Sequence, residues 1–301
     1  MENKLRRVFE LFRRAIRRYK KDNPVQLAGT TAFFAVFAMA PVIIIVVSAA
    51  GILLGQDQIQ TKLFEQIDNF LGEQGMKYIR SIVENFQDTQ KSIFGVIVGF
   101  IIFIFISTTF FSILQNSLNF VWRIRAKPRH NILKALYDRV ISFGLILSLG
   151  FVMLISFIVD AAMSLFNDFM YESFPEFTVL IIEVGNSIFS FAIVMIFFAM
   201  IYRFLPDAYI KWRVTWVGAL ITTILFLLGK AIISFGLGST NIDAMYGAAG
   251  SLVVILLWVF YSSLIFFFGA EITQQYAEMY SLDIKPKDYA VMIEINEVKD
   301  G

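Results

Sequence analysis

Six long apolar stretches dominate the hydrophobic pattern of this chain. They lie near residues 28–55, 92–122, 138–165, 178–204, 214–236 and 247–273. Apolar residues fall on every side of each stretch, and none of the stretches alternates in the manner of a β-strand. A helix of roughly 20 residues is long enough to cross the hydrocarbon core of a bilayer. The pattern therefore predicts an all-α fold, a polytopic membrane helical bundle with six transmembrane helices across residues 28–273.

Basic residues are distributed unevenly between these predicted spans. The 1–27 segment contains nine Lys and Arg residues, the 123–137 connection five and the 203–213 turn three. The alternate connections contain more acids than bases; they are 56–91, 166–177 and 237–246. Lys and Arg in short loops favour the cytoplasmic side of a membrane. The sequence therefore predicts a multi-pass protein of the cytoplasmic (inner) membrane with both termini in the cytoplasm.

The first 27 residues predict a basic amphipathic helix in the cytoplasm. Within 4–21, one helical stripe is apolar and the other face is rich in arginine. Such a helix suits the surface of an anionic leaflet, where each base contributes about 1 kcal/mol. An apolar stripe has no use in binding RNA, so membrane lipid is the expected partner and nucleic acid is not. Asn23-Pro24 then indicates the start of the next helix.

Two further segments lie outside the predicted spans. The 56–91 segment has two apolar stripes separated by Gly72 and Gly75, which predicts an outer hairpin of two amphipathic helices. The 274–301 tail is mixed in charge and contains Pro286. We expect this cytoplasmic tail to be frayed after Tyr280 and to contain no functional site.

Composition narrows the class of protein further. Hydrophobic residues make up 57% of the chain and charged residues 17%, well below the charge content of soluble domains. The chain has no Cys and one His, His130, so cysteine nucleophiles and His-cluster metal sites are excluded. Nucleotide-binding and hydrolase motifs are missing as well. We therefore expect no enzyme, no catalytic residues, no metal and no cofactor.

Ionisable residues inside the spans are the candidate functional positions, because a charge at membrane depth is costly. Asp160, Glu183 and Lys230 are expected about 8–9 Å below the outer surface, from a rise of 1.5 Å per residue. They predict a mutually neutralised cluster lining an outward-facing cavity. The alternative is that Lys230 extends to the interface and that the two acids lie in the headgroup zone.

Glu271 lies near the inner end of the last span, at a depth similar to that of Arg203. The simpler interpretation is a structural Glu–Arg pair. The alternative is a carboxylate linked to protons or substrate. Both residues are therefore candidates for a substrate or ion pathway.

Several motifs in this chain resemble one known family. They are the stretch from Leu27 to Pro41, Leu114-Gln115 with Leu118-Asn119 and Trp122, Tyr202 through Asp207, Trp212, Gly218-Ala219, Tyr246-Gly247, Trp258, and Gly269-Ala270-Glu271. In order and spacing they are similar to the YihY/BrkB family, the "virulence factor BrkB" inner-membrane proteins, over roughly residues 20–275.

This resemblance implies a six-span protein of the bacterial inner membrane. The family-like positions are Pro41, Asn119, Arg203, Pro206, Asp207, Tyr246, Gly247 and Glu271, to which the resemblance assigns no role. Some members carry the label ribonuclease BN. One loop histidine cannot supply the converging metal ligands that such a nuclease needs.

Two functions remain open, beside that of a membrane-embedded enzyme, for which only the acids Asp160 and Glu183 would meet at one depth. The first is a transporter or flippase-like protein that moves an unknown small or lipidic (amphipathic) solute through a polar cavity. The second is a non-transporting scaffold that organises the envelope, with the 56–91 segment as its contact surface. The sequence decides neither the substrate nor whether the chain forms a homo-oligomer.

Overall fold

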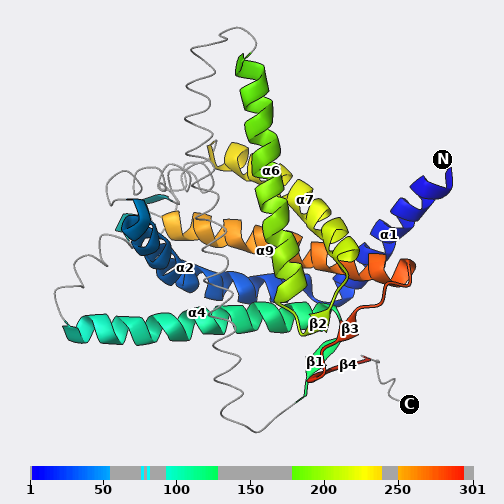
Figure 1. Ribbon diagram of the computed structural model, residues 1–301, viewed down its shortest axis with the longest axis horizontal. Helices are drawn as coiled ribbons and strands as arrows, with labels where there is room; N and C mark the ends of the chain where they lie inside the picture. Colours follow the sequence, from blue (N-terminus) through cyan, green and yellow to red (C-terminus); the bar gives the residue numbers. More distant parts are fainter. Residues whose placement is uncertain are drawn as a thin grey trace.

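The computed structural model describes residues 2–54, 76–77, 80–81, 93–127, 178–238 and 250–294, and these residues are mostly helical (Figure 1). The helices are α1 (Glu2–Lys21), α2 (Pro24–Leu54), α4 (Ile93–Val121), α6 (Thr178–Phe204), α7 (Trp212–Gly238) and α9 (Gly250–Met279). Five of these occupy the ranges of predicted spans. The predicted span 138–165 and most of the predicted hairpin 56–91 lie outside the described residues.

Three of the described helices are long and apolar enough to cross a membrane. These spans are Ser187–Phe204, Trp212–Ile233 and Leu252–Met279. A helical membrane protein is therefore supported, and the total of six spans stays a prediction.

The last long helix, α9, continues beyond the predicted end at residue 273. It ends at Met279, and Ser281, two residues further on, takes a left-handed backbone conformation with φ 51°. The Leu282 N–H then donates to the Ala277 carbonyl at 2.9 Å, which satisfies a terminal carbonyl in a Schellman-type cap. Glu271 therefore lies two turns before the helix end.

The residues after α9 that the structure describes, through Glu294, form strands and turns, so the expectation of a frayed tail after Tyr280 is wrong for them. Strand β3 (Lys285–Pro286) pairs antiparallel with β2 (Ala208–Tyr209), and β4 (Ala290–Met292) pairs antiparallel with β1 (Ile124–Ala126). These backbone hydrogen bonds fix the tail to the loops after α6 and α4. The predicted all-α fold is therefore incomplete, because the structure also contains two short β-ladders.

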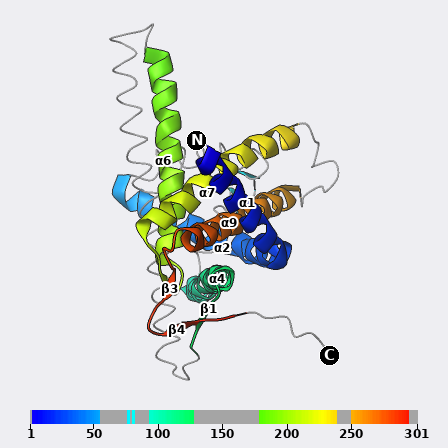
Figure 2. The same cartoon turned by 90° about the vertical axis from the view of Figure 1, so that its right-hand side faces the viewer.

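Helix α9 lies in the middle of the described helices, with α7, α2 and α1 packed around it (Figures 1 and 2). Its contact with α7 is close because small residues face each other. A β-carbon at Gly269 would clash with Thr222 and lie 2.5 Å from the Tyr202 hydroxyl. One at Gly218 would clash with Thr273. Small residues at helix interfaces are how membrane helices pack closely.

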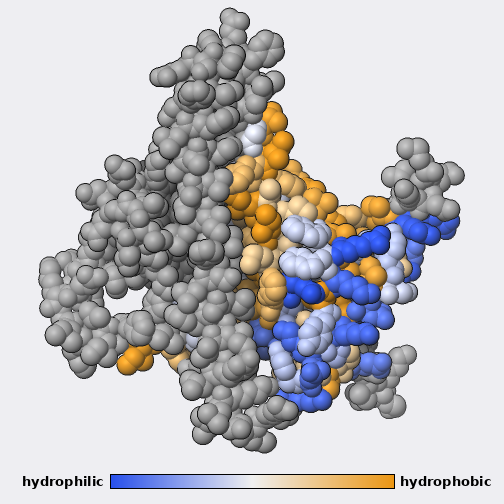
Figure 3. Space-filling view, in the orientation of Figure 1, coloured by the Kyte–Doolittle hydropathy of each residue, from blue (hydrophilic) through white to orange (hydrophobic). Residues whose placement is uncertain are grey.

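One end of this bundle gathers the end of α1, the loops after α4 and α6, and the tail after α9. The two β-ladders and an ion pair between Arg123 and Asp22 join these segments. Figure 3 shows hydrophilic residues gathered there and hydrophobic residues on the helices beside them. The sequence predicts this end to be cytoplasmic, and that side of the membrane stays a prediction.

Candidate functional site

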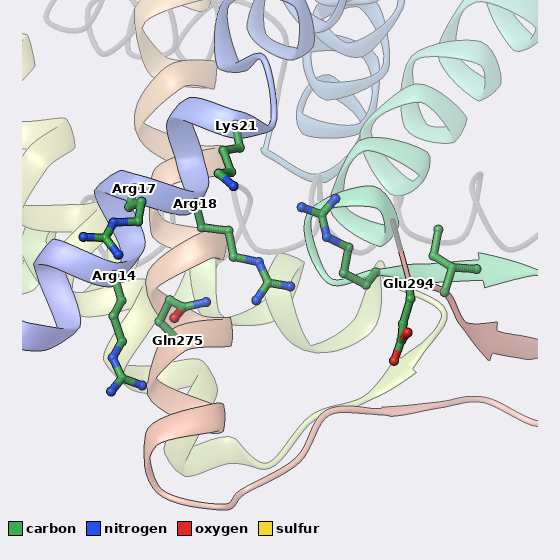
Figure 4. A pocket seen from close by; sticks show the side chains of 8 residues that line it. Arg14, Arg17, Arg18, Lys21, Gln275 and Glu294 are labelled. Atoms are coloured by element: carbon green, nitrogen blue, oxygen red, sulfur yellow. The ribbon is translucent and has the colours of Figure 1, made fainter. Parts of the chain in front are cut away.

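The hydrophilic end of the bundle contains a cavity of about 480 Å³. Its walls come from α1, the loop after α4, α9 and the end of the tail (Figure 4). The lining residues are Arg14, Arg17, Arg18, Lys21, Arg123, Gln275, Ile293 and Glu294. Five of these eight are bases and one is an acid. A concave site with this balance favours an anion.

Helix α1 presents its bases to the cavity because another face of it is buried against α9. Leu11 and Ala15 are buried in a small cluster with Ile272. The Tyr19 hydroxyl donates to the Leu264 carbonyl at 2.7 Å. Arg14 and Lys21 each lie three or four positions from the adjacent Arg17 and Arg18, so the four bases share one side of α1.

The same docking decides the environment of Tyr19. Burial raises the pKa of the Tyr19 hydroxyl above its ordinary value. The phenol is therefore neutral at physiological pH and remains a hydrogen-bond donor to α9.

Arg18 is held by two acids of α9. Its guanidinium lies 3.0 Å from Glu278 Oε1, and its Nε lies 3.7 Å from Glu271 Oε1. Gln275 Nε2 also donates to Glu271 Oε1 at 3.1 Å. The Glu271 side chain is 1% exposed, and its Oε2 has no hydrogen-bond partner among the described residues. A buried carboxylate with one unsatisfied oxygen therefore lies directly behind the basic wall.

The remaining cavity bases differ in their ion pairs. Arg14 pairs with the exposed Glu10 at 2.5 Å, and Arg123 pairs with the buried Asp22. Within the described ranges, Arg17 and Lys21 make no ion pair, and both are exposed. These two bases are the part of the cavity that is available to an external anion.

A second cluster of polar residues, centred on Asn119 and Asp207, lies at the same end of the bundle. Asn119 Nδ2 donates to Asp207 Oδ2 at 2.8 Å, and the Asp207 N–H donates back to Asn119 Oδ1 at 2.9 Å. Gln115 donates to the other carboxylate oxygen at 3.1 Å. The Trp122 indole N–H donates to the Ala270 carbonyl at 2.9 Å. These bonds connect α4 to the loop after α6 and to α9.

Lys287 lies in the tail beside this cluster, and its N–H donates to the Asp207 carbonyl at 2.9 Å. Burial lowers the pKa of the Lys287 ammonium; the Asp207 carboxylate opposes this shift and Arg203 adds to it. Arg203 itself lies over the Trp212 ring, 5.5 Å from the ring centroid. The sequence grouped Arg203 with Glu271, whereas the structure pairs Glu271 with Arg18 and stacks Arg203 on an aromatic ring.

Lys230 is in α7, half-buried, and far from the basic cavity. Gly218 lies against Thr273, and Gly229 against Tyr261, so α7 and α9 run antiparallel with Glu271 level with about residue 220 of α7. At 1.5 Å per residue, Lys230 is about 15 Å further along the bundle. Lys230 and Glu271 therefore belong to different levels.

The structure describes only some of the other candidate residues. Asp160, Tyr246 and Gly247 lie outside the described residues, as do the side chains of Glu183 in α6 and Pro41 in α2. The predicted cluster of Asp160, Glu183 and Lys230 consequently stays a prediction. Pro206 is buried in the loop after α6. In the part of the chain that the structure describes, no three potential metal ligands gather.

The sequence missed the basic cavity itself. The strongest signal in the sequence is the arginine face of α1, which the amphipathic pattern by itself predicts to lie on the lipid surface. Arg123 and Glu294 are far away in the chain, and nothing in their spacing indicates that they face α1. A tail expected to fray also could not be seen as a cavity wall.

Comparison with known proteins gives a consistent result over most of the chain. The family model described as "Virulence factor BrkB" matches residues 15–290. A "UPF0761 membrane protein" of Acinetobacter baylyi is 26% identical over 293 residues, which is 95% of this chain and 66% of that protein. Another from Alteromonas mediterranea is 25% identical, covering 92% of this chain and 90% of that protein. A third, from Aeromonas salmonicida, is 26% identical with 85% of each covered. No solved structure matches the chain.

Proposed function

The chain belongs to the Virulence factor BrkB family, and from this premise we propose that it is a transporter or flippase-like protein that moves a small or amphipathic solute across the membrane. The observation that carries the proposal is the buried Glu271 beside a polar cavity at the end of an apolar bundle. A carboxylate at such a position is costly, and in membrane proteins it commonly marks a solute or ion pathway.

Helix α1 supports a role at the membrane surface. Its apolar side is wider than its contact with α9, so Phe9 and Ile16 are 70% and 44% exposed. These side chains would enter the interface of an anionic leaflet while the neighbouring bases contact its headgroups. An amphipathic solute in that leaflet would then be adjacent to the mouth of the cavity.

The solute would meet two charged levels along the bundle. The first is the basic cavity with Arg18 and Glu271, and the second is Lys230, about 15 Å further along. Lys230 would neutralise an anionic group, and Asp160 and Glu183 would complete that level. Protonation of Glu271, Asp160 or Glu183 would couple movement to a proton or cation gradient. The proposal includes no catalytic step.

Transport in proteoliposomes tests this function. Purified full-length protein is reconstituted, and the movement of a fluorescent anionic phospholipid between leaflets is followed. We expect activity in the natural chain and its loss in Glu271→Gln and Lys230→Ala. Asp283→Asn is the control, because Asp283 is an exposed acid of the tail after α9 that does not line the cavity. Equal activity in all three variants would contradict the proposal.

The scaffold alternative makes a different prediction in the same experiment. A scaffold moves neither lipid nor ions, and its function in cells depends on the 56–91 segment. Absent transport together with loss of cellular function on deletion of 56–91 would favour the scaffold. Most of that segment lies outside the described residues.

A further inference from the structure

We propose that the basic cavity is a binding site for a phosphomonoester group, carried by a lipid headgroup or by a free phosphate. This inference names a substrate class for the proposed function. It rests on the proposed function for the idea that the bound molecule is transported. It does not depend on transport for its test, because binding is measured separately.

The first argument is the arrangement of donors. Arg14, Arg17, Arg18 and Lys21 line the cavity from α1, and Arg18 and Lys21 point toward the wall that holds Glu294 (Figure 4). Arg123 lines it from the loop after α4. Guanidinium groups offer paired N–H donors that match two oxygens of a phosphate at once. The volume of about 480 Å³ lies within the range of ligand pockets and leaves room for the group that carries the phosphate.

The second argument is charge. Arg14, Arg18 and Arg123 each have an acidic partner, whereas Arg17 and Lys21 make no ion pair among the described residues. A phosphomonoester has a charge of about −1.5 to −2 at neutral pH. Arg17 and Lys21 supply two unmatched positive charges, of which Glu294 offsets one. A phosphomonoester offers three terminal oxygens to these donors, whereas a phosphodiester offers two and has a single negative charge.

The third argument is that Arg18 is already held in place. Glu278 and Glu271 contact its guanidinium from α9, and Gln275 fixes Glu271 in turn. A side chain that is ordered before binding loses less conformational entropy when the ligand arrives. The acids thus position Arg18, while Arg17 and Lys21 supply the unmatched charge.

One lining residue has a negative charge that weakens binding of the proposed anionic ligand. Variants of the site can therefore be expected either to weaken or to strengthen binding. Glu294 lines the wall contributed by the tail and is exposed. Its carboxylate repels an anion in the cavity. Removing that charge should strengthen binding, which a merely damaged protein would not show.

Non-specific attraction to the anionic leaflet is the competing explanation. It would depend on the total charge of α1 and not on which bases line the cavity. Arg13 and Lys20 provide the comparison, because both are exposed bases of α1 and neither lines the cavity. A built site distinguishes the pair Arg17 and Lys21 from the pair Arg13 and Lys20.

The experiment measures binding of fluorescent phosphatidic acid, a phosphomonoester lipid, to the full-length protein in neutral detergent micelles. Fluorescent phosphatidylglycerol, which has one negative charge, is the phosphodiester comparison, and inorganic phosphate is the soluble competitor. We expect the double variant R17Q/K21Q to weaken phosphatidic acid binding by about tenfold or more, and R13Q/K20Q by less than about threefold. E294Q should strengthen it by about threefold. Thermal unfolding of each variant checks that the fold is unchanged.

The outcomes separate the sources and the two proposals. If inorganic phosphate at a similar concentration displaces phosphatidic acid, free phosphate is sufficient for binding. If inorganic phosphate does not displace it, the site requires a phosphate group carried by a lipid. Both results support the site. Equal weakening by the two double variants overturns the site. Equally tight binding of phosphatidylglycerol overturns it as well. If phosphatidic acid binding changes as expected in the variants but no transport is seen in liposomes, the site is supported and the proposed function is overturned. If transport is seen but phosphatidic acid does not bind, the proposed function is supported and the site is overturned.

Discussion

Asn119 and Asp207 bind each other through two reciprocal hydrogen bonds, although they lie 88 positions apart in the chain. The Asn119 amide donates to the carboxylate and accepts from the Asp207 backbone N–H. Both side chains are buried. The pair fixes the end of α4 to the loop between α6 and α7, and so sets one side of the hydrophilic end.

Replacing Asn119 by Ala should destabilise the fold. The change leaves the buried Asp207 carboxylate and backbone N–H short of partners, and we expect a loss of about 2–4 kcal/mol. Thermal unfolding of the purified protein in detergent measures it. Asn116→Ala on the same helix is the control, because Asn116 is exposed. An equally small effect of both changes would show that the reciprocal pair contributes little.

Replacing Gly269 by Ala should separate α7 from α9. The added methyl group would clash with Thr222 and crowd the Tyr202 hydroxyl, which hydrogen-bonds to both Thr222 and the Phe266 carbonyl. We expect a loss of about 1–3 kcal/mol from overpacking. Thermal unfolding again gives the measurement.

Gly185→Ala is the matched control for this prediction. Gly185 is also within a long helix, α6, and a β-carbon there meets nothing within 4 Å. Because Ala is the better helix former, this control should be neutral or slightly stabilising. A similar loss in both variants would mean that helix packing at Gly269 is not the cause.

Removing Arg18 should expose the cost of burying Glu271. Arg18→Met leaves that carboxylate without its cationic partner, and we expect a loss of about 1–3 kcal/mol. The value is below that for a fully buried pair because Arg18 is 29% exposed. Adding Glu271→Gln should restore much of the stability. A double variant no more stable than Arg18→Met would show that the two charges are not coupled.

The docking of α1 on α9 should weaken at alkaline pH. Because burial raises the pKa of Tyr19, docked α1 retains a proton that an undocked tyrosine loses near pH 10. Docking free energy should therefore be constant below about pH 10 and fall as pH rises above it. Tyr19→Phe should remove this dependence.

The chain has no Cys, so one introduced cysteine can report on α1. A nitroxide at the exposed Phe9→Cys gives the mobility of the helix by electron paramagnetic resonance. Mobility should increase above about pH 10 in the natural background and not in Tyr19→Phe. Identical pH profiles in the two backgrounds would exclude Tyr19 as the titrating group.

Single cysteines also test the predicted orientation. Lys127, Lys211 and Glu294 are exposed at the hydrophilic end, so cysteines at these positions should all react with an impermeant reagent from the cytoplasmic face. A cysteine at Asp168, in the acidic connection 166–177, should react from the opposite face. Reaction of Asp168→Cys and Lys127→Cys from the same face would contradict the six-span topology.

Local pattern determined where most of the described helices lie and what class of protein this is. Runs of apolar residues long enough for a bilayer predicted the ranges of α2, α4, α6, α7 and α9. Pro24 begins α2 as predicted, since proline is favoured in a first helical turn. Family motifs also marked Asn119, Asp207 and Glu271 without giving them partners. Such features depend on residues that are neighbours in the chain.

Only the tertiary structure decided which charged residues meet. Several bases had a predicted depth near that of Glu271, and the docking of α1 on α9 selected Arg18 from among them. The pairing of β4 with β1 brought the tail, and with it Glu294, to the cavity that Arg17 and Lys21 also line. Helix periodicity gives the face of each helix but not its rotation against a partner that is distant in sequence. The basic cavity depends on that rotation, and the sequence could therefore supply its residues without revealing that they form one site.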